Sequence, residues 1–266
     1  MEKIINTQEI VIDKDALSFE IDAKEDIKLS LKCVSDASVF FSIINASNLE
    51  IEMEVINGSN VSLFFSNDSD NDVDIKENYS VNKDSKLTVS YSEFNDITAK
   101  RYTSIKLLEE GAEGTINSAS LVNSKKDFRF IVENVAANTF GKLNNYAVVL
   151  KEGRLMIDAI GKIDKGARGS ESHQTSRALS FADGQKTTIL PELLIDENDV
   201  KASHAMSIGR MDDDQLYYLM SRGLSVEDCT SLVSAGYLYP IFESIKDEDI
   251  KNKLKENLER KLASLW

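Results

Sequence analysis

Residues 191–223 read PELLIDENDVKASHAMSIGRMDDDQLYYLMSRG, and within them the hydrophobic pattern changes its period. From Asp199 to Ile208 apolar and polar residues alternate, which is the period of a β-strand. From Asp212 onward apolar residues recur at the helical spacing, as they do on one face of an amphipathic α-helix. The stretch therefore predicts that a strand-rich body ends here and that a helical tail begins.

One of the two histidines of the chain, His204, lies at this boundary. It falls on the apolar side of the alternation, together with Val200, Ala202, Met206 and Ile208. Neutral imidazole is a good ligand for iron and zinc. Two interpretations remain open at this point. His204 is either a core histidine satisfied by one hydrogen bond to the backbone, or a ligand or interface group at the boundary.

The residues that precede this stretch, 1–190, read as one half-buried strand after another. Apolar and polar residues alternate, for example, in 27–33, 49–55 and 128–132. Polar clusters rich in Asn, Asp, Ser and Gly separate these segments at intervals of roughly ten to fifteen residues, a spacing typical of all-β proteins. The sequence therefore predicts a mainly β body.

The alternation alone fits a sandwich, a closed barrel or a solenoid. The run of strands is long for one sandwich, and no segment before Pro191 is convincingly helical. We see no repeat of fixed length, although solenoid coils often share only a faint sequence repeat. These observations favour a β-solenoid.

We expect two regions, a β core over residues 1–210 and a helical region over 211–266. Helix starts are indicated by residues that cap or charge a first turn, and helix ends by glycines. We expect a first helix that starts at Asp212, with Gln215 three residues later, and ends at Gly223, and a second that starts at Ser225, with Asp228 in its first turn, and ends at Gly236. A short third piece starts at Pro240, and the last helix runs from Asp247 to about Ser264.

The composition excludes several functions. The formal net charge is -14 and no dense Lys/Arg stripe is present, so nucleic acid is not an expected partner. No leader-like start and no apolar run of membrane-spanning length appear, so we expect a cytoplasmic protein with no membrane partner. Cys33 and Cys229 then are expected to be free thiols.

The common catalytic motifs are missing from the sequence. It has no phosphate-binding loop, so we expect no nucleotide on this chain itself, and no nucleophile elbow or zinc motif. We therefore expect a protein that is not an enzyme. An alternative that stays open is a β-helix carbohydrate-active enzyme, since such enzymes use paired Asp and Glu residues.

A second candidate site is the pair Glu171 and His173, at positions i and i+2. If this segment is a strand, both side chains lie on the same face and form a possible two-ligand metal site with His204 as a further ligand. The alternative is a polar loop or an exposed strand pair.

An ordered set of residues in and after the opening stretch resembles the SufB/SufD family of the SUF iron–sulfur cluster assembly system. The segments that carry the resemblance are Pro191–Leu193, Asp199–His204, Gly209–Asp212, Gln215–Leu224 and Gly236–Tyr237, preceded by GARGSESHQTSRAL. Upstream of about residue 140 only the all-β character matches.

The resemblance implies a right-handed parallel β-helix core, followed by C-terminal helices that dock SufC, an ABC-type ATPase. It implies that two core subunits, two copies or a copy and a SufB/SufD paralogue, pair at the C-terminal end of the β-helix. A transient iron–sulfur cluster would form near that interface, with sulfur from cysteine-desulfurase delivery proteins. His204 is the histidine of the family's K-x-S-H motif, and the implied ATPase contacts are Gln215, Tyr218, Arg222, Gly223 and Tyr237.

The chain departs from SufB at two positions. Thr175 stands where SufB has an acceptor cysteine, and Ala205 stands where SufB has a glutamate after the histidine. Both departures favour SufD-like chemistry, with Glu171 and His173 as substitute ligands near Thr175. A purely structural SufD-like partner without its own cluster is a further alternative.

Overall fold

The computed structural model describes residues 1–56, 58–181 and 186–265, which form seventeen strands followed by helices. The strands are β1 (Glu2–Ile4), β2 (Gln8–Ile12), β3 (Leu17–Asp22), β4 (Ile27–Cys33), β5 (Ala37–Asn45), β6 (Asn48–Val55), β7 (Asn60–Asn67), β8 (Val73–Val81), β9 (Lys86–Glu93), β10 (Ala99–Leu107), β11 (Glu113–Val122), β12 (Lys125–Asn134), β13 (Phe140–Val149), β14 (Arg154–Ile163), β15 (Glu171–Ser180), β16 (Thr187–Ile195) and β17 (Lys201–Gly209).

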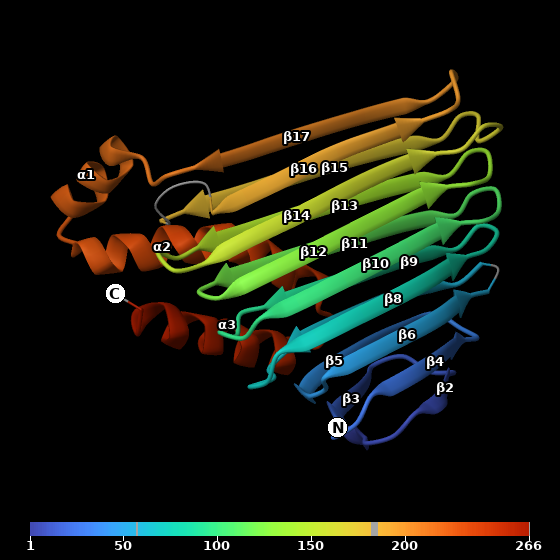
Figure 1. Ribbon diagram of the computed structural model, residues 1–266, viewed down its shortest axis with the longest axis horizontal. Coiled ribbons are helices and arrows are strands. Elements are labelled where there is room, and N and C mark those ends of the chain that lie inside the picture. The colour runs from blue at the N-terminus through green and yellow to red at the C-terminus, as the bar shows by residue number, and fades with distance from the viewer. Residues whose placement is uncertain (57, 182–185, 266) are drawn as a thin grey trace.

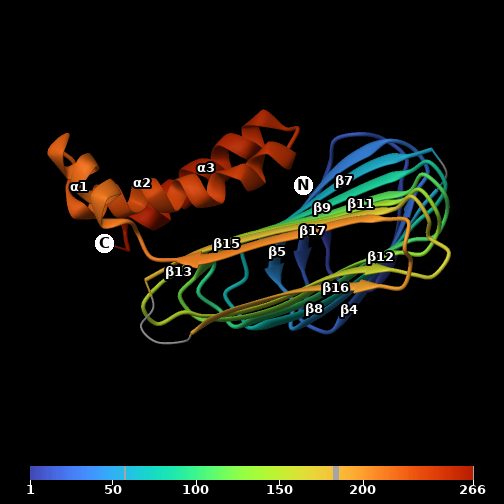
Figure 2. The same ribbon diagram turned by 90° about the horizontal axis from the view of Figure 1, so that it is seen from above.

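Consecutive strands alternate between two facing parallel sheets (Figures 1 and 2). The odd-numbered strands form a nine-stranded sheet and the even-numbered strands an eight-stranded sheet, each in the order of the chain. Each coil therefore adds one strand to each sheet, and the chain winds as a β-solenoid. The expected parallel β-helix core is confirmed.

The coils lengthen along the chain, which explains why no fixed repeat is visible in the sequence. Leu17 pairs with Val39, 22 residues later, whereas Phe140 pairs with Glu171, 31 residues later. The strands keep the same parallel register while the turns between them grow. A search for one period therefore misses a repeat that is regular only in space.

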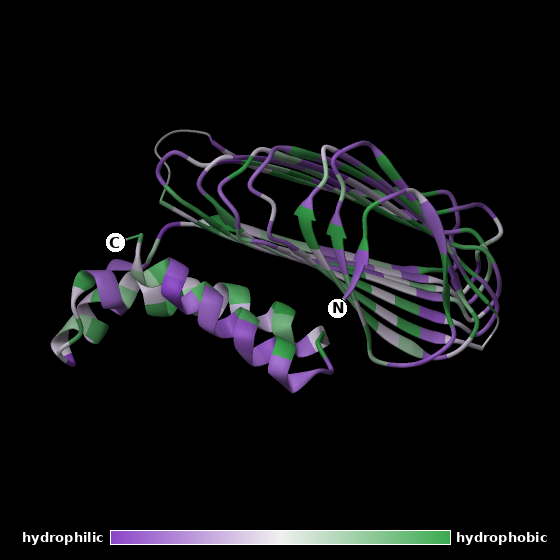
Figure 3. Ribbon diagram, turned by 90° about the horizontal axis from the view of Figure 1, so that it is seen from below, coloured by the Kyte–Doolittle hydropathy of each residue, from purple (hydrophilic) through white to green (hydrophobic). Residues whose placement is uncertain are grey.

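The core lies between the two sheets, where the apolar residue of each alternating pair points inward. The strand alternation is visible as hydrophilic and hydrophobic stripes in Figure 3. An aromatic column runs through successive coils, with ring centroids 4.7 to 5.9 Å apart, from Phe19 through Phe41 and Phe65 to Tyr91 and Phe130. Burial of apolar surface and stacked rings both stabilise this column.

The C-terminal segments are α1 (Asp213–Ser221), α2 (Val226–Leu238), the 3₁₀ helix η1 (Tyr239–Ser244) and α3 (Glu248–Ala263). The predicted N-caps Asp212 and Ser225 are confirmed, as is the helix start at Asp247, which also caps α3. The predicted stop at Gly223 is confirmed too, and its φ of 96° favours glycine. The prediction that Gly236 ends the second helix is wrong. None of the described helices combines the length and the apolar character needed to cross a bilayer.

The helices cover the outer face of the nine-stranded sheet (Figure 2). A second apolar cluster joins them to that face, and Gly236 continues α2 because its flanking residues Ala235 and Leu238 are anchored there. The cluster consists of Phe64, Ala119, Leu121, Val148, Leu150 and Leu179 from the sheet and Ala235, Leu238, Ile241, Phe242, Ile245, Leu254, Leu258 and Leu262 from the helices. Helix α1 has no buried residue and projects beyond the sheet.

Candidate functional site

The strand that carries His204, β17, is the last strand of the nine-stranded sheet, and among the described residues its one strand partner is β15. The predicted strand is confirmed, but its predicted apolar face is not buried, because all nine residues of β17 are exposed. Within the part of the chain that the structure describes, no further coil covers this end of the solenoid. The apolar residues of this alternating strand are therefore exposed in the single chain, as they are on a surface that binds another protein.

His204 lies in register with Gln174 of β15, so both side chains point to the same side of the sheet. Gln174 is 3% exposed, and its Nε2 donates to the carbonyl of Glu192 in β16, on the opposite sheet, at 2.7 Å. The Gln174 side therefore faces the solenoid interior. His204 is directed toward the interior side of the open end and is itself exposed, not a core histidine.

Glu171 and His173 lie in β15 and are joined on its outer face, as their spacing predicts. His173 Nε2 lies 3.2 Å from Glu171 Oε2, and His173 Nδ1 lies 2.8 Å from Ser203 Oγ in β17. Lys201 Nζ donates to Glu171 Oε1 at 2.8 Å, and this bond, then that of His173, lowers the pKa of Glu171. The cluster fastens β17 to β15.

The predicted site residues therefore divide between two faces of one sheet. Thr175 lies in register with Ala205, two residues beyond His173 on the outer face. His204 lies on the opposite face, so Glu171 and His173 cannot share one small ligand with it inside a single chain. Among the described residues no group of three or more His, Cys, Asp or Glu side chains is placed to hold a metal ion.

The open end of the solenoid exposes two unpaired strand edges, those of β16 and β17. Unpaired N–H and C=O groups along such edges form a template for a further strand. Large apolar side chains accompany these edges and are 38 to 47% exposed, namely Leu190, Leu194, Ile195, Met206 and Ile208. This end combines the two features that favour association with another protein surface.

The residues that the resemblance assigns to the ATPase contact differ in their exposure. Gln215, Tyr218 and Arg222 are exposed on or next to α1, where the Arg222 guanidinium lies 5.2 Å from the Tyr218 ring. Gly223 is exposed directly after this helix. Tyr237 instead is half-buried and packs against the second apolar cluster on the sheet.

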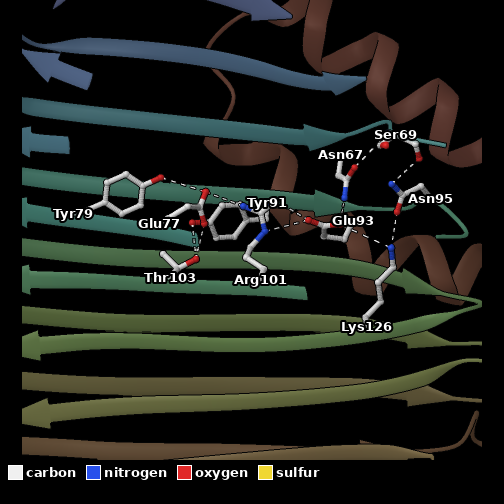
Figure 4. Close-up of polar contacts among 10 residues, drawn as sticks. All are labelled: Asn67, Ser69, Glu77, Tyr79, Tyr91, Glu93, Asn95, Arg101, Thr103 and Lys126. Carbon is white, nitrogen blue, oxygen red and sulfur yellow. Dashed lines mark hydrogen bonds and ion pairs between the residues drawn. The ribbon is translucent and has the colours of Figure 1, made fainter. Parts of the chain in front are cut away.

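Sequence reasoning missed a buried ionic network inside the solenoid (Figure 4). Arg101 Nη1 lies 2.8 Å from Glu77 Oε1, and Arg101 Nη2 lies 2.8 Å from Glu93 Oε1. Lys126 Nζ donates to Asn95 Oδ1 at 2.5 Å and lies 3.9 Å from Glu93 Oε2. All four charged side chains are at most 1% exposed, so their charges compensate one another away from bulk solvent.

The protonation of this network follows from its surroundings. Burial opposes the charge of Arg101, but the carboxylates of Glu77 and Glu93 outweigh it and raise the pKa of Arg101. Burial lowers the pKa of Lys126. The strand alternation could have revealed the network from the sequence. It places Glu93 on the same inward face as Tyr91, and Lys126 on the same inward face as Phe128.

The expected free thiols are confirmed, since Cys33 and Cys229 are both unpaired and buried. Cys33 lies in the solenoid core, and burial raises the pKa of its thiol. Cys229 lies inside α2. Neither sulfur is therefore placed to act as an exposed acceptor or ligand.

Comparison with known proteins matches residues 7–237 to the family model described as SUF system FeS cluster assembly, SufBD core domain. The chain is 33% identical to iron–sulfur cluster assembly protein SufD of Bacillus subtilis over 186 residues, covering 68% of this chain and 42% of that protein. It is 25% identical to SufD of Escherichia coli over 162 residues, covering 60% of this chain and 38% of that protein. The aligned part thus spans about two fifths of these relatives. The chain belongs to the SufB/SufD family of the SUF iron–sulfur cluster assembly system.

Proposed function

We propose that this chain is a non-catalytic scaffold subunit for iron–sulfur cluster assembly, which binds an ABC-type ATPase and pairs with a second core subunit. The observation that carries the proposal is the family match over residues 7–237. That range includes both the open end of the solenoid and the exposed helix α1. The match favours a scaffold over the alternative of a carbohydrate-active enzyme.

Pairing would take place at the open end of the solenoid, through β16 and β17. A second copy of this chain or a SufB/SufD paralogue could bury the exposed apolar side chains there and pair with a free strand edge. His204, on the interior side of β17, would then lie at the interface between the two subunits.

The cluster would be cargo assembled at this interface and passed on. One chain offers His204 there but no accessible thiolate, so the remaining ligands would come from the second subunit or from delivered sulfide. Glu171 and His173 are weaker candidates, because both ring nitrogens of His173 already have partners. Cysteine-desulfurase sulfur-delivery proteins would be the expected source of sulfur.

The ATPase would dock on α1 and the adjacent surface of α2. Tyr217 is 76% exposed and Tyr218 is 55% exposed, and exposed aromatic residues are frequent anchors of protein interfaces. Because only Arg210 to Asp212 separate β17 from α1, a movement of the docked ATPase could reach His204 through a short segment.

The docking surface can be tested by co-expression with a SufC-like ATPase and size-exclusion chromatography. We expect a complex with the wild-type chain and its loss in Tyr217→Ala/Tyr218→Ala. Glu256→Gln, an exposed change on α3, is the matched control and should keep the complex. A complex that survives the double substitution would reject α1 as the docking helix.

The role of His204 can be tested by anaerobic reconstitution of the paired core with iron and sulfide. We expect His204→Ala to retain less iron and sulfide than the wild type, and His173→Ala to resemble the wild type. Equal binding by wild type and His204→Ala would favour the alternative of a structural SufD-like partner without its own cluster. Sedimentation of each variant checks that pairing itself is unchanged.

A further inference from the structure

The stacked coils align charged side chains into columns on the outside of the eight-stranded sheet. Neighbouring residues of a column are about 4.8 Å apart, so the sign of each charge affects the next coil. In most of these columns the sign alternates. One example is Asp74, Lys100 and Asp127, and another is Lys106, Glu133 and Lys162.

One column breaks this rule with three cations in succession, Lys125, Arg154 and Lys186, which we call the basic column. Lys125 pairs with Arg154 at the start of β12 and β14. Lys186 lies beside Arg154, because Thr187 pairs with Leu155 and the Leu155 N–H donates to the Lys186 carbonyl at 2.9 Å.

The described residues give the basic column little compensation. Lys125 and Arg154 are exposed, and neither side chain has a hydrogen bond or ion pair with any residue of the described part of the chain. Lys186 Nζ donates to the Lys151 carbonyl at 3.0 Å and lies 3.8 Å from Oε2 of Glu152, whose side chain is 75% exposed. Like charges directly opposite on neighbouring strands are destabilising, so the column is unfavourable without an anion.

The surface at the basic column is also hollowed. A depression of about 320 Å³ is lined by Lys125, Lys126, Arg154, Leu155, Met156 and Lys186. The Lys126 side chain is turned into the solenoid, so the three cations of the column supply the charge of this depression. The lining residues lie where β12, β14 and β16 begin, on the side of the solenoid at which α1 is drawn in Figure 1.

We propose that the basic column binds a small multivalent oxyanion of the diphosphate type. The guanidinium of Arg154 offers a planar fork that matches phosphate oxygens, and the flanking lysines add point charges. The three cations extend over about 10 Å along the sheet, two strand spacings, which suits linked phosphate groups better than one monovalent anion.

The charge of the whole chain selects against a large polyanion. With a formal net charge of -14, the protein repels nucleic acid at long range. A small anion in the depression lies within the screening length of about 8 Å at physiological ionic strength, where the nearby cations dominate. The register, the charges and the depression together support this anion site, and none of them depends on the proposed function.

The test is calorimetric titration of the full chain with inorganic pyrophosphate at low ionic strength. We expect saturable binding that weakens as salt is added, and at least about a tenfold loss of affinity in Arg154→Gln. Lys100→Gln is the matched control, since Lys100 is an exposed cation of an alternating column on the same sheet, and it should bind like the wild type.

A second measurement separates binding from a folding defect. Without an anion, Arg154→Gln relieves the repulsion and should raise the melting temperature by about 1–3 °C, whereas pyrophosphate should raise that of the wild type only. No binding to the wild type, or equal affinity in Arg154→Gln, would overturn the proposal. Tighter binding of a polyglutamate peptide than of pyrophosphate, lost in Arg154→Gln, would also overturn it in favour of an acidic protein segment.

Discussion

Arg101→Met tests whether the buried network inside the solenoid depends on its central cation (Figure 4). Arg101 contacts Glu77 and Glu93 at 2.8 Å each, and all three side chains are at most 1% exposed. The substitution keeps most of the side-chain volume but leaves two carboxylates in the interior without their principal counter-charge. Thr103, which donates to Glu77 Oε2 at 2.6 Å, cannot replace a charge.

Removing one partner of a buried ion pair costs about 3–5 kcal/mol, because the charge left behind is desolvated and uncompensated. That is a large part of the total free energy of unfolding of about 5–15 kcal/mol that is typical of folded proteins. At about 2–4 °C per kcal/mol for chains near this size, the melting temperature should fall by roughly 6–20 °C.

The assay is urea unfolding followed by circular dichroism, with a thermal scan beside it. Two comparison variants identify the cause. Arg129→Met removes an exposed cation 3.4 Å from Asp158 and should cost only about 0–1 kcal/mol. Combining Arg101→Met with Glu77→Gln should restore much of the lost stability, because the charges of Glu93 and Lys126 that remain compensate each other. Unfolding of Arg101→Met like that of Arg129→Met, or a double variant no more stable than the single one, would refute this account.

Three further predictions concern the helices and the last strand. Phe242→Ala, in the second apolar cluster and 0% exposed, should lower the free energy of unfolding by about 3–5 kcal/mol in urea and speed proteolysis of the helical region; a loss below about 1 kcal/mol would contradict this. Hydrogen bonds from Lys201 and then His173 lower the pKa of Glu171 in the folded protein. The stability that the ionised Glu171 adds by linking β17 to β15 is therefore fully present above pH 4.5, the ordinary pKa of a glutamate, and is lost as pH falls through the lower pKa of the folded state. The protection of the β17 amides, taken relative to their intrinsic exchange rate at each pH, should fall over that acid range in the wild type. An equal fall in Glu171→Gln would count against the link. Burial, then a hydrogen bond to Glu259, raises the pKa of Tyr239 to about 12. The stability that the neutral Tyr239 hydroxyl contributes is therefore present below pH 10 and lost as pH rises through about 12. In an absorbance titration Tyr239→Phe should remove a tyrosinate step near pH 12, and a titration in which no such step disappears would be evidence against this pKa.

Local sequence signals predicted the elements because their causes are local. Alternation at 27–33 and 49–55 follows from the pleat of a strand with one side in the core. The caps Asp212 and Ser225 accept hydrogen bonds from backbone N–H groups three residues later, so short-range chemistry fixes both helix starts. The same motif residues also predicted the family and hence the parallel β-helix.

The candidate site depended on register, which the sequence indicated only in part. The i, i+2 spacing placed Glu171 and His173 on one face, as observed. Their position relative to His204 required the pairing of β15 with β17, which sets His204 beside Gln174 rather than beside His173. A shift of one residue would exchange the two faces, and no local signal fixes that shift.

The sequence by itself therefore determined the strands, the helix starts, the change from β to α near residue 210 and the family. Only the tertiary structure decided that coils of 17 to 32 residues stack in parallel, that Arg101 and Lys126 lie inside the solenoid, and that Lys125, Arg154 and Lys186 stand in one column. The physical reason is the range of the forces. Capping and alternation act between residues that are close in sequence, whereas charge compensation and burial depend on residues brought together by coils some 20 to 30 positions apart.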